Sequence, residues 1–368
     1  AIQRVSTWIQ MRKENTQTKE SNTPQQIMSI KTILINITVL EQSGAVFRCI
    51  IKNNAFFSCI IISKKVFEGS DIIMHYVIGD VHGCYDKMIQ LVNKIESQDT
   101  DAKIIFVGDF VDRGPDTMKC IRWAMDHITA DGKYQSVRGN HEEMIIEWYE
   151  MFCKWYNNQL EDGVKKEDIK KELLYMPQTN YDFSDLIEEE DMVDPKKIEP
   201  IIMFFNNLPL SKEITVTSNY GVPVNYKIVH AAYDHQPVNE RVFKDKCLWE
   251  RDHRNLYNND IVVHGHTPTI SEYYPAVLGY RPGMICYDTG DVNVDGGCVF
   301  FKYDGDSFPC FLCAICLETL DEIYSSTLEE WAQDYAGDSY KSYLKAYKNR
   351  CRDFEHPYGR DELLLRLQ

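Results

Sequence analysis

The feature that most constrains the fold is a short apolar run that ends in glycine and a polar residue and leads into a helical pattern. This unit occurs three times in succession, about every 30 residues, which is the length of a strand–helix–strand unit. The apolar runs are Tyr76–Gly79, Ile104–Val107 and Tyr134–Val137, and the helical patterns after them are Cys84–Ile95, Pro115–Ile128 and Glu142–Trp155. This order predicts an α/β fold in which neighbouring strands run parallel.

The second half of the chain lacks this rhythm but contains further strand and helix patterns. An acidic stretch at 157–200 is predicted to form helices and loops that cover one end of the fold. Beyond it we expect one helix at Pro200–Asn207. Four strands are expected after this helix, at Tyr226–Val229, Asp260–Val263, Met284–Tyr287 and Cys298–Tyr303. The stretch Ser326–Arg350 has a helical pattern, and Ser326 with Glu329 matches a capping box at its start.

Composition changes near residue 73. Residues 1–73 carry a net charge of +4, begin without Met and open on a polar stretch that is predicted to be disordered, whereas residues 74–368 carry −20. Met74 leads directly into a strand pattern. We therefore predict that the native chain begins at Met74 and that residues 1–73 are a disordered extension or a non-native leader. A small β-rich extension is the alternative.

Net charge and apolar content exclude two classes of partner. The chain carries −16 overall, and because nucleic-acid backbones attract surfaces rich in Lys and Arg, we expect no nucleic-acid partner. The most apolar run, Phe56–Ile62, is far shorter than the roughly 20 residues that cross a bilayer. We therefore expect no membrane partner and a cytoplasmic location. The oligomeric state cannot be read from the sequence.

Most of the twelve cysteines lie in apolar runs, where buried reduced thiols are expected. One group, Cys310, Cys313 and Cys316, has a spacing that can ligate zinc or an iron–sulfur cluster. Because no fourth cysteine is near and the residues between them are apolar, we predict a buried strand and keep the metal site as the alternative.

Five polar motifs follow predicted strands or lie at their carboxyl ends. They are 79–83 (GDVHG), 108–114 (GDFVDRG), 139–142 (GNHE), 229–231 (VHA) and 264–267 (HGHT). Ligands of α/β sheets bind at this edge, so the five motifs are expected to meet in one cleft. A single Gly-Asp or His is usually a turn or a satisfied side chain, but five such motifs in order are hard to assign to chance.

The polar side chains of these motifs are ligand types that suit Mn, Fe or Zn. Asp80 and His82 lie two residues apart and can face the same way, and Asp109 supplies a second carboxylate that can bridge two cations. The residues that can complete a second site are Asn140, His230 and His266. Two cations about 3.5–4 Å apart would form a clamp for phosphoryl transfer, with a bridging hydroxide as the attacking group.

A leaving alkoxide needs a proton, and His141, next to the candidate ligand Asn140, is the predicted acid. Asp112 is the carboxylate expected to orient this imidazole and to favour its protonated form. Arg113 is placed to grip phosphate oxygens with two nitrogens, and Arg251 is a second candidate clamp.

In chain order the sequence reads GDVHG, GDFVDRG, RGNHE, VHA, LWERD, GHTP and DTG. This array, over about residues 74–305, resembles the PPP family of metal-dependent phosphoprotein phosphatases, a group of calcineurin-like phosphoesterases. It is similar to the bacterial and phage branch, which also contains symmetrical diadenosine-tetraphosphate hydrolases. The resemblance implies a central β-sandwich of mixed sheets flanked by helices.

The resemblance also implies roles for single residues. One metal ion would be bound by Asp80, His82 and Asp109, and the other by Asp109, Asn140, His230 and His266. His141 with Asp112 would be the acid, and the phosphate contacts would be Arg113, Arg251 and Asn140. Where the family usually has His-Ala-Gly, this chain has His230-Ala231-Ala232, and the family pattern does not account for residues 320–368.

Together these observations predict a phosphatase of phosphoserine and phosphothreonine in proteins, with a phosphoprotein or phosphopeptide as its substrate partner. Its cofactors would be two divalent cations, manganese or alternatively iron or zinc. The catalytic domain would span 74–320 and a helical extension 321–368. The first alternative is a dinucleoside-polyphosphate hydrolase, with Tyr233, Tyr273 and Tyr274 available for stacking on nucleosides. The second is a non-catalytic scaffold that binds phosphoproteins.

Overall fold

The computed structural model divides the chain into two units, Ala1–Ile72 and Ile73–Gln368. The second is described at 73–160, 195–251, 260–271, 280–288, 290–300, 308–351 and 359–368, and at the single residues 163, 165, 173, 354 and 357. In the first only the backbone of four strands is described, in which β2 (Val46–Lys52) pairs antiparallel with its neighbours. The neighbours are β1 (Ile33–Thr38), β3 (Ala55–Phe56) and β4 (Ile60–Ile62). Such strands are what the alternative prediction, a small β-rich extension, would contain. The start of the native chain at Met74 stays a prediction.

The repeating strand–helix pattern forms the first sheet of the larger unit. Its three parallel strands are β5 (His75–Ile78), β6 (Lys103–Phe106) and β7 (Tyr134–Ser136). The helices that follow them are α2 (Tyr85–Gln98), α3 (Thr117–His127) and α4 (Asn140–Tyr156). Two antiparallel strands, β13 (Cys313–Cys316) and β14 (Glu322–Tyr324), complete the order β14-β13-β5-β6-β7. The predicted strand–helix order is confirmed, and the antiparallel strands make the sheet mixed.

The second sheet has the order β11-β12-β10-β9-β8 and is also mixed. Its strands are β8 (Ser211–Thr217), β9 (Pro223–Val229), β10 (Asp260–His264), β11 (Cys286–Asp288) and β12 (Asp291–Asn293). The prediction of a strand at Cys298–Tyr303 is wrong for residues 298–300, the part of this range that the structure describes. Gly297 has a φ of +70°, and the amide of Phe300 donates to its carbonyl (2.9 Å), so the chain turns here.

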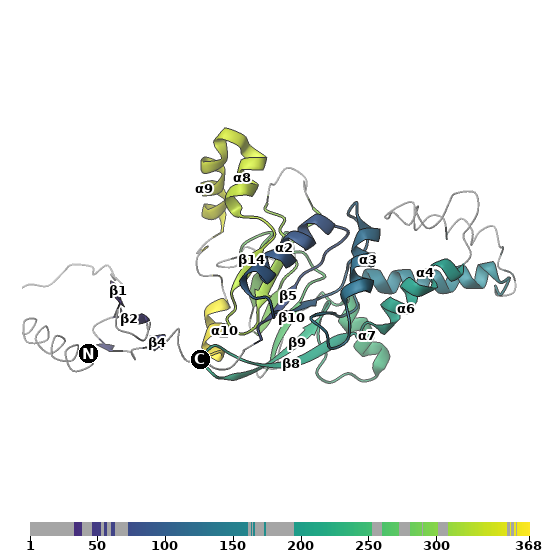
Figure 1. Cartoon of the computed structure of the whole chain (residues 1–368), viewed down its shortest axis with the longest axis horizontal. Coiled ribbons are helices and arrows are strands. Elements are labelled where there is room, and N and C mark those ends of the chain that lie inside the picture. Colours follow the sequence, from purple (N-terminus) through teal and green to yellow (C-terminus); the bar gives the residue numbers. More distant parts are fainter. Residues whose placement is uncertain are drawn as a thin grey trace, which may run out of the picture. The chain divides into compact units, whose positions relative to one another are not determined.

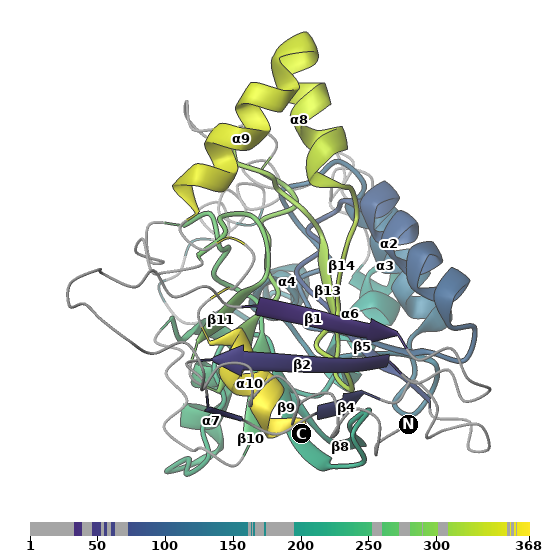
Figure 2. The same ribbon diagram turned by 90° about the vertical axis from the view of Figure 1, so that its left-hand side faces the viewer.

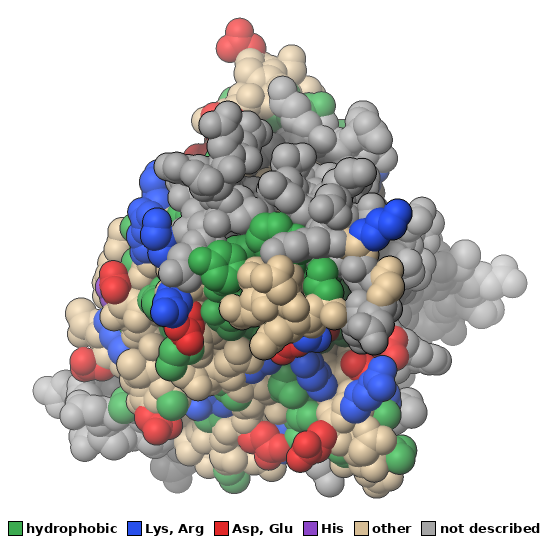
Figure 3. All heavy atoms as spheres, turned by 90° about the vertical axis from the view of Figure 1, so that its right-hand side faces the viewer, with side chains coloured by type: hydrophobic (Ala, Val, Ile, Leu, Met, Phe, Trp, Pro, Cys, Tyr) green, Lys and Arg blue, Asp and Glu red, His purple; other side chains and the backbone are tan. Residues whose placement is uncertain are grey.

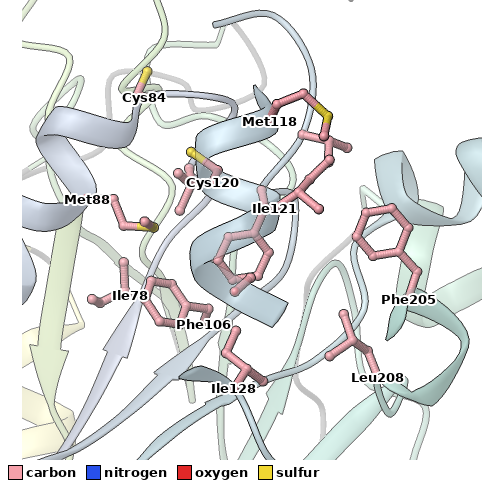
Figure 4. Packing of buried hydrophobic residues seen from close by; sticks show 14 of the residues in the cluster. Ile78, Cys84, Met88, Phe106, Met118, Cys120, Ile121, Ile128, Phe205 and Leu208 are labelled. Carbon is pink, nitrogen blue, oxygen red and sulfur yellow. The ribbon is translucent and has the colours of Figure 1, made fainter. Parts of the chain in front are cut away.

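The two sheets pack face to face and helices cover their outer faces. On β6, Ile104 and Phe106 point toward α2 and α3, whereas Ile105 lies between the sheets. Figure 4 shows the helix side of this packing, where Ile78 and Phe106 meet Met88 of α2. Strands that are buried on both faces are apolar at nearly every position, which is why the sequence shows continuous runs rather than alternation.

On the far side of the second sheet, α7 (Glu240–Trp249) packs Cys247 against Val229 and Val262. The layers are therefore helices, sheet, sheet and helix, with α6 (Glu199–Asn207) beside α3 and α4 on the first outer face (Figure 1). This confirms the predicted class, a central sandwich of mixed sheets flanked by helices. Most of the acidic insert at 157–200 lies outside the described residues.

The carboxyl-terminal stretch contributes to both the sheet and the core. The expected domain boundary at 320 falls inside the β13–β14 hairpin, and Leu363 of α10 (Arg360–Arg366) is buried between the sheets. Figure 2 shows α8 (Leu328–Ala336) and α9 (Tyr340–Arg350) as a helical hairpin. The capping box lies one residue later than predicted, at Thr327 and Glu330, because the Thr327 hydroxyl accepts the Glu330 amide (3.1 Å).

Among the described helices, none combines the length and apolar character that a membrane span requires.

Candidate metal centre

The loops that carry the five polar motifs meet at the carboxyl ends of β5, β6, β9 and β10. Backbone hydrogen bonds join them. The amide of His82 donates to the carbonyl of Asp109 (2.8 Å), and the amide of Gly265 donates to the carbonyl of His230 (2.9 Å). The first turn of α4 joins this group because the amide of His141 donates to Asp109 Oδ1 (3.0 Å). The relative positions of the motifs are thus held by backbone as well as by side chains.

Two groups of described residues have the geometry to hold a metal ion, and both contain Asp109. The first is His82, Asp109 and His141, and the second is Asp80, Asp109 and His230; in each, the ligand atoms lie within 4.8 Å of one another. Asp109 Oδ2 lies 3.5 Å from His82 Nε2 and 3.4 Å from His230 Nε2. A carboxylate shared between two ligand groups is what a centre of two cations requires.

This grouping differs in one respect from the assignment that the resemblance implies. Distances place His141 with His82 and Asp80 with His230, whereas the sequence pairs Asp80 with His82 and leaves His141 outside the metal sites. His141 Nε2 lies 4.0 Å from Asp109 Oδ2, the longest of these contacts. Whether His141 acts as a ligand or as an acid stays a prediction that a variant can test.

Two imidazoles are held in the tautomer that metal ligation needs. His82 Nδ1 lies 2.8 Å from the carbonyl of Val111, and His230 Nδ1 lies 3.0 Å from the carbonyl of Val107. A carbonyl can only accept, so Nδ1 carries the hydrogen in both rings and Nε2 presents its lone pair to Asp109. Burial also lowers the pKa of His82 well below its usual value, which keeps this ring neutral.

Asn140 and His266 extend the second group. Asn140 Oδ1 lies 2.7 Å from His230 Nε2 and 3.1 Å from His266 Nδ1, and the two ring nitrogens are 3.2 Å apart. Because His230 Nδ1 already holds the hydrogen, its Nε2 and the amide oxygen face each other as two acceptors. A cation would satisfy both atoms, so this donor set fits a divalent metal ion.

Five of the predicted site residues have backbone φ angles in the left-handed region. They are His82 (44°), Asp109 (50°), Asp112 (77°), Arg113 (68°) and His266 (66°). Such angles cost L-amino acids about 1–3 kcal/mol each and persist only where the surrounding structure holds them. This strain is concentrated where the loops turn their side chains toward one point.

The predicted acid is held by its predicted partner. His141 Nδ1 is hydrogen-bonded to Asp112 Oδ2, and both side chains are buried. Burial raises the pKa of Asp112 to about 9 and lowers the pKa of His141, while the nearby charge of Asp109 acts to raise that of His141. In the metal-free protein burial therefore opposes the protonated imidazole that the sequence predicts, and the negative charge of Asp109 favours it.

The two predicted clamps lie at the same centre. Arg113 Nη1 lies 2.7 Å from His82 Nε2, and its Nη2 lies 3.0 Å from His141 Nε2. The guanidinium is permanently charged and donates both hydrogen bonds. Arg251 Nη1 donates to the hydroxyl of Thr267 (3.2 Å), the residue after His266. All nine residues predicted for binding or catalysis, with Arg251 as a tenth, are thus brought into one neighbourhood, and their roles stay predictions.

Glu142 supports this centre and was not predicted as a functional residue. It is fully buried, and its carboxylate accepts the amides of Asp109 (2.8 Å), Phe110 (2.8 Å) and Gly139 (2.9 Å). One side chain thereby fixes the loop after β6 to the first turn of α4. A carboxylate three residues into a helix is an ordinary capping signal, and nothing local marks the two partners in the β6 loop.

Asp295 is a second buried carboxylate that the sequence did not mark. It follows β12, is buried, and carries a charge that acts on Asp80. Burial, then the charges of Asp295 and Asp109, raise the pKa of Asp80 well above its usual value. The other motifs were found from polar residues at the ends of predicted strands, but the three-residue strand before Asp295 was not predicted.

Other polar candidates lie apart from this centre. The Tyr233 hydroxyl donates to Glu213 (2.5 Å) and its ring packs against Phe243, whereas Tyr273 and Tyr274 lie outside the described residues. Cys313 and Cys316 are buried on β13 as predicted. Neither of the two candidate metal groups among the described residues contains a cysteine.

Comparison with known proteins agrees with this geometry. The sequence model of the family described as calcineurin-like phosphoesterase matches residues 76–277. This range contains all ten predicted site residues and both candidate metal groups.

Three relatives differ in their named substrates. A symmetrical bis(5'-nucleosyl)-tetraphosphatase of Wigglesworthia glossinidia brevipalpis is 24% identical over 54% of this chain and 86% of its own length. Serine/threonine-protein phosphatase 2 of Salmonella typhimurium is 27% identical over 50% of this chain and 71% of its own length. A zinc-dependent endopolyphosphatase of Saccharomyces cerevisiae is 31% identical over 32% of this chain, and the match spans only 34% of that protein.

Proposed function

The chain belongs to the calcineurin-like phosphoesterase family, and on that premise we propose that it hydrolyses phosphoserine and phosphothreonine in proteins. The observation that carries this proposal is the buried His141–Asp112 pair beside Arg113. The alkoxide that leaves a serine or threonine monoester is a strong base and needs a proton. The leaving group of a polyphosphate is itself a phosphate and needs little help, so a built acid favours the monoester.

The cofactors proposed are two divalent cations, manganese or alternatively iron or zinc. The residues that would hold them are Asp80, His82, Asp109, Asn140, His230 and His266. Bound cations would supply Lewis-acid polarisation of phosphate oxygens and lower the pKa of a water molecule. The chain itself orients His82 and His230 through their carbonyl contacts, which keeps their Nε2 atoms available as ligands.

The arginines and His141 perform the remaining steps. Arg113 presents two guanidinium nitrogens at the centre, the number that binds two oxygens of one phosphate dianion. Arg251, held by Thr267, would contact the phosphate from the side of His266. His141 would donate its proton from Nε2 to the leaving oxygen, with Asp112 fixing the ring through Nδ1.

A phosphoprotein substrate has to approach a chain of net charge −16, which repels acidic peptides. The surface charge is not uniform: Figure 3 shows Lys and Arg side chains interspersed with Asp and Glu around a hydrophobic patch on one face. We therefore expect phosphopeptides with few acidic flanking residues to be the better substrates.

One observation favours the second candidate, a dinucleoside-polyphosphate hydrolase. Trp249 is 44% exposed and its ring lies 6.4 Å from that of His266, in an edge-on arrangement. An exposed indole next to the centre can stack on a nucleobase. The matching relatives include both substrate classes, so the two activities have to be compared directly.

The deciding experiment compares phosphate release from a phosphothreonine peptide with cleavage of diadenosine tetraphosphate, both with Mn²⁺. We expect a higher kcat/KM for the peptide. Trp249→Ala should reduce nucleotide cleavage and leave peptide turnover unchanged. The matched control is Tyr335→Ala, an exposed aromatic residue on α8. Preference for the nucleotide, lost in Trp249→Ala alone, would favour the second candidate. No hydrolysis of either substrate would favour the non-catalytic scaffold.

A further inference from the structure

Arg113, the predicted phosphate clamp, has one side-chain contact that no predicted role accounts for. Its guanidinium carbon lies 5.7 Å from the centre of the Phe300 ring, within the range of a cation–π contact. Its side-chain hydrogen bonds to described residues go to Nε2 of His82 (2.7 Å) and Nε2 of His141 (3.0 Å). Arg113 is an exposed residue, so these three contacts matter for where its long side chain lies.

The two hydrogen bonds cannot hold Arg113 during the proposed reaction. His82 Nδ1 already donates to the carbonyl of Val111, so Nε2 is the lone pair that this ring can offer, and a bound cation would take it. His141 Nε2 is the atom that has to face the leaving oxygen, and a guanidinium nitrogen at 3.0 Å occupies that place. Arg113 therefore has to leave both nitrogens before it can bind phosphate.

The contact with Phe300 has no such conflict. The face of an aromatic ring attracts a cation through its quadrupole, so this contact takes up no lone pair of a metal ligand. The guanidinium of Arg113 is permanently charged, so the attraction does not depend on pH. Phe300 can therefore keep Arg113 near the centre after the imidazole nitrogens have been given to other partners.

Phe300 ends a turn that is fastened to the rest of the site. Its amide donates to the carbonyl of Gly297 (2.9 Å), and the amide of Gly297 donates to Asp295 Oδ1 (2.9 Å). Gly297 has a φ of +70°, and a Cβ there would lie 3.2 Å from Cδ2 of the Phe300 ring. The thiol of Cys298 donates to the carbonyl of Asp80 (3.2 Å), which ties the turn to the first motif. The ring is thus supported by backbone that also carries the centre.

We infer that Phe300 is a positioning residue for the phosphate clamp: its ring keeps the Arg113 guanidinium at the metal centre when phosphate is bound. The inference rests on the proposed function, in which Arg113 binds two oxygens of one phosphate. Phe300 acts through Arg113 and needs no contact with the substrate. Because it lies outside the polar motifs, no local sequence pattern marks it.

The test compares Phe300→Leu, which keeps an apolar side chain and removes the ring, with Phe300→Tyr, which keeps the ring. Calorimetry on the full chain with Mn²⁺ gives the Kd of inorganic phosphate, and turnover of a phosphothreonine peptide gives KM and kcat. We expect Phe300→Leu to raise both Kd and KM roughly 2- to 30-fold, the range that corresponds to one cation–π contact. The change in kcat should be smaller, because the clamp binds phosphate both before and during the reaction. Phe300→Tyr should give values near those of the wild type.

A double-mutant cycle shows whether Phe300 acts through Arg113. Arg113→Ala should raise the phosphate Kd by itself, and adding Phe300→Leu to it should raise the Kd no further. The matched control is Phe308→Leu, because the Phe308 ring lies 4.8 Å from the guanidinium carbon of Arg350, a similar contact outside the motifs. This control should leave the phosphate Kd unchanged. Phe300→Leu should also leave the Kd for Mn²⁺ of the metal-stripped chain unchanged.

Several results would overturn the inference. They are a wild-type phosphate Kd in Phe300→Leu, a Phe300→Tyr variant as weak as Phe300→Leu, and a further loss when Phe300→Leu is added to Arg113→Ala. An equal loss of Mn²⁺ affinity would also overturn it, because it would indicate a structural role. A wild-type chain that binds phosphate but hydrolyses neither substrate would overturn the proposed function, and the phosphate Kd would still decide the role of Phe300. Should Phe300→Leu fail to fold, Phe300→Met takes its place.

Discussion

Gly139 offers a steric test of the metal centre, because it touches the shared carboxylate with backbone alone. Its φ of −90° and ψ of 168° are accessible to any residue, so alanine adds no backbone strain. A Cβ at this position would lie 2.0 Å from Asp109 Oδ1, 2.4 Å from the Asp109 amide and 2.7 Å from Glu142 Oε2. The substitution Gly139→Ala therefore acts on Asp109 and on the side chain that supports it.

The size of the effect follows from these distances. Real Cβ atoms essentially never come within 3.0 Å of another heavy atom, so Asp109 has to move by about 1 Å, and displacements of that size can reduce turnover by about 100-fold. Overpacking of this kind costs about 1–3 kcal/mol of stability. At roughly 2–4 °C for each kcal/mol, the fall in Tm should be measurable without unfolding the protein at assay temperature.

The assay combines metal content by elemental analysis, Tm and kcat on a phosphothreonine peptide. The matched control is Gly132→Ala, whose Cβ would lie 2.2 Å from the Thr129 hydroxyl but otherwise has no heavy atom nearer than 3.5 Å. Thr129 can rotate away, so we expect this variant to keep its metal and its turnover. A folded Gly139→Ala protein with full metal content and wild-type kcat would refute the assignment of Asp109 as the shared ligand.

Three further predictions concern the same centre. His141→Ala should lower kcat by roughly 10²–10⁴ and keep both metal ions if His141 is the acid; loss of one metal ion would instead make it a ligand, as its distance from Asp109 permits. Asp109→Asn should abolish activity and lower the content of both metal ions, and two fully bound ions in this variant would contradict a bridging role. The stability of the metal-free protein should fall as pH rises from about 4 toward 9. Burial raises the pKa of Glu142 to about 8 and that of Asp112 to about 9. In this range the folded chain therefore holds protons that the unfolded chain has released, so raising the pH favours unfolding. Thermal unfolding across this range with a chelator checks the sign, and a Tm that rises with pH would show that other groups dominate.

Several features of the fold could be predicted from local sequence. The continuous apolar runs gave the three parallel strands, and the helical spacing gave α2, α3 and α4. The position of polar motifs at strand ends predicted that they would meet, since parallel strands share one edge. The missed elements are short or polar: β12 has three residues, Asp291–Asn293, and β8 has only one buried position.

The amino-acid sequence by itself determined which side chains are available as ligands, because the types and spacing of Asp, His and Asn within the motifs are local properties. Only the tertiary structure decided their supporting contacts. Glu142 accepts amides from a loop more than 30 positions away, and Asp295, which follows a strand of the second sheet, lies close enough to Asp80 for its charge to act there. Neither partner is adjacent in sequence, and neither contact has a periodic pattern. The physical reason is that burial sets the charge and hydrogen-bonding demands of a carboxyl group, and burial is fixed only when the two sheets pack together.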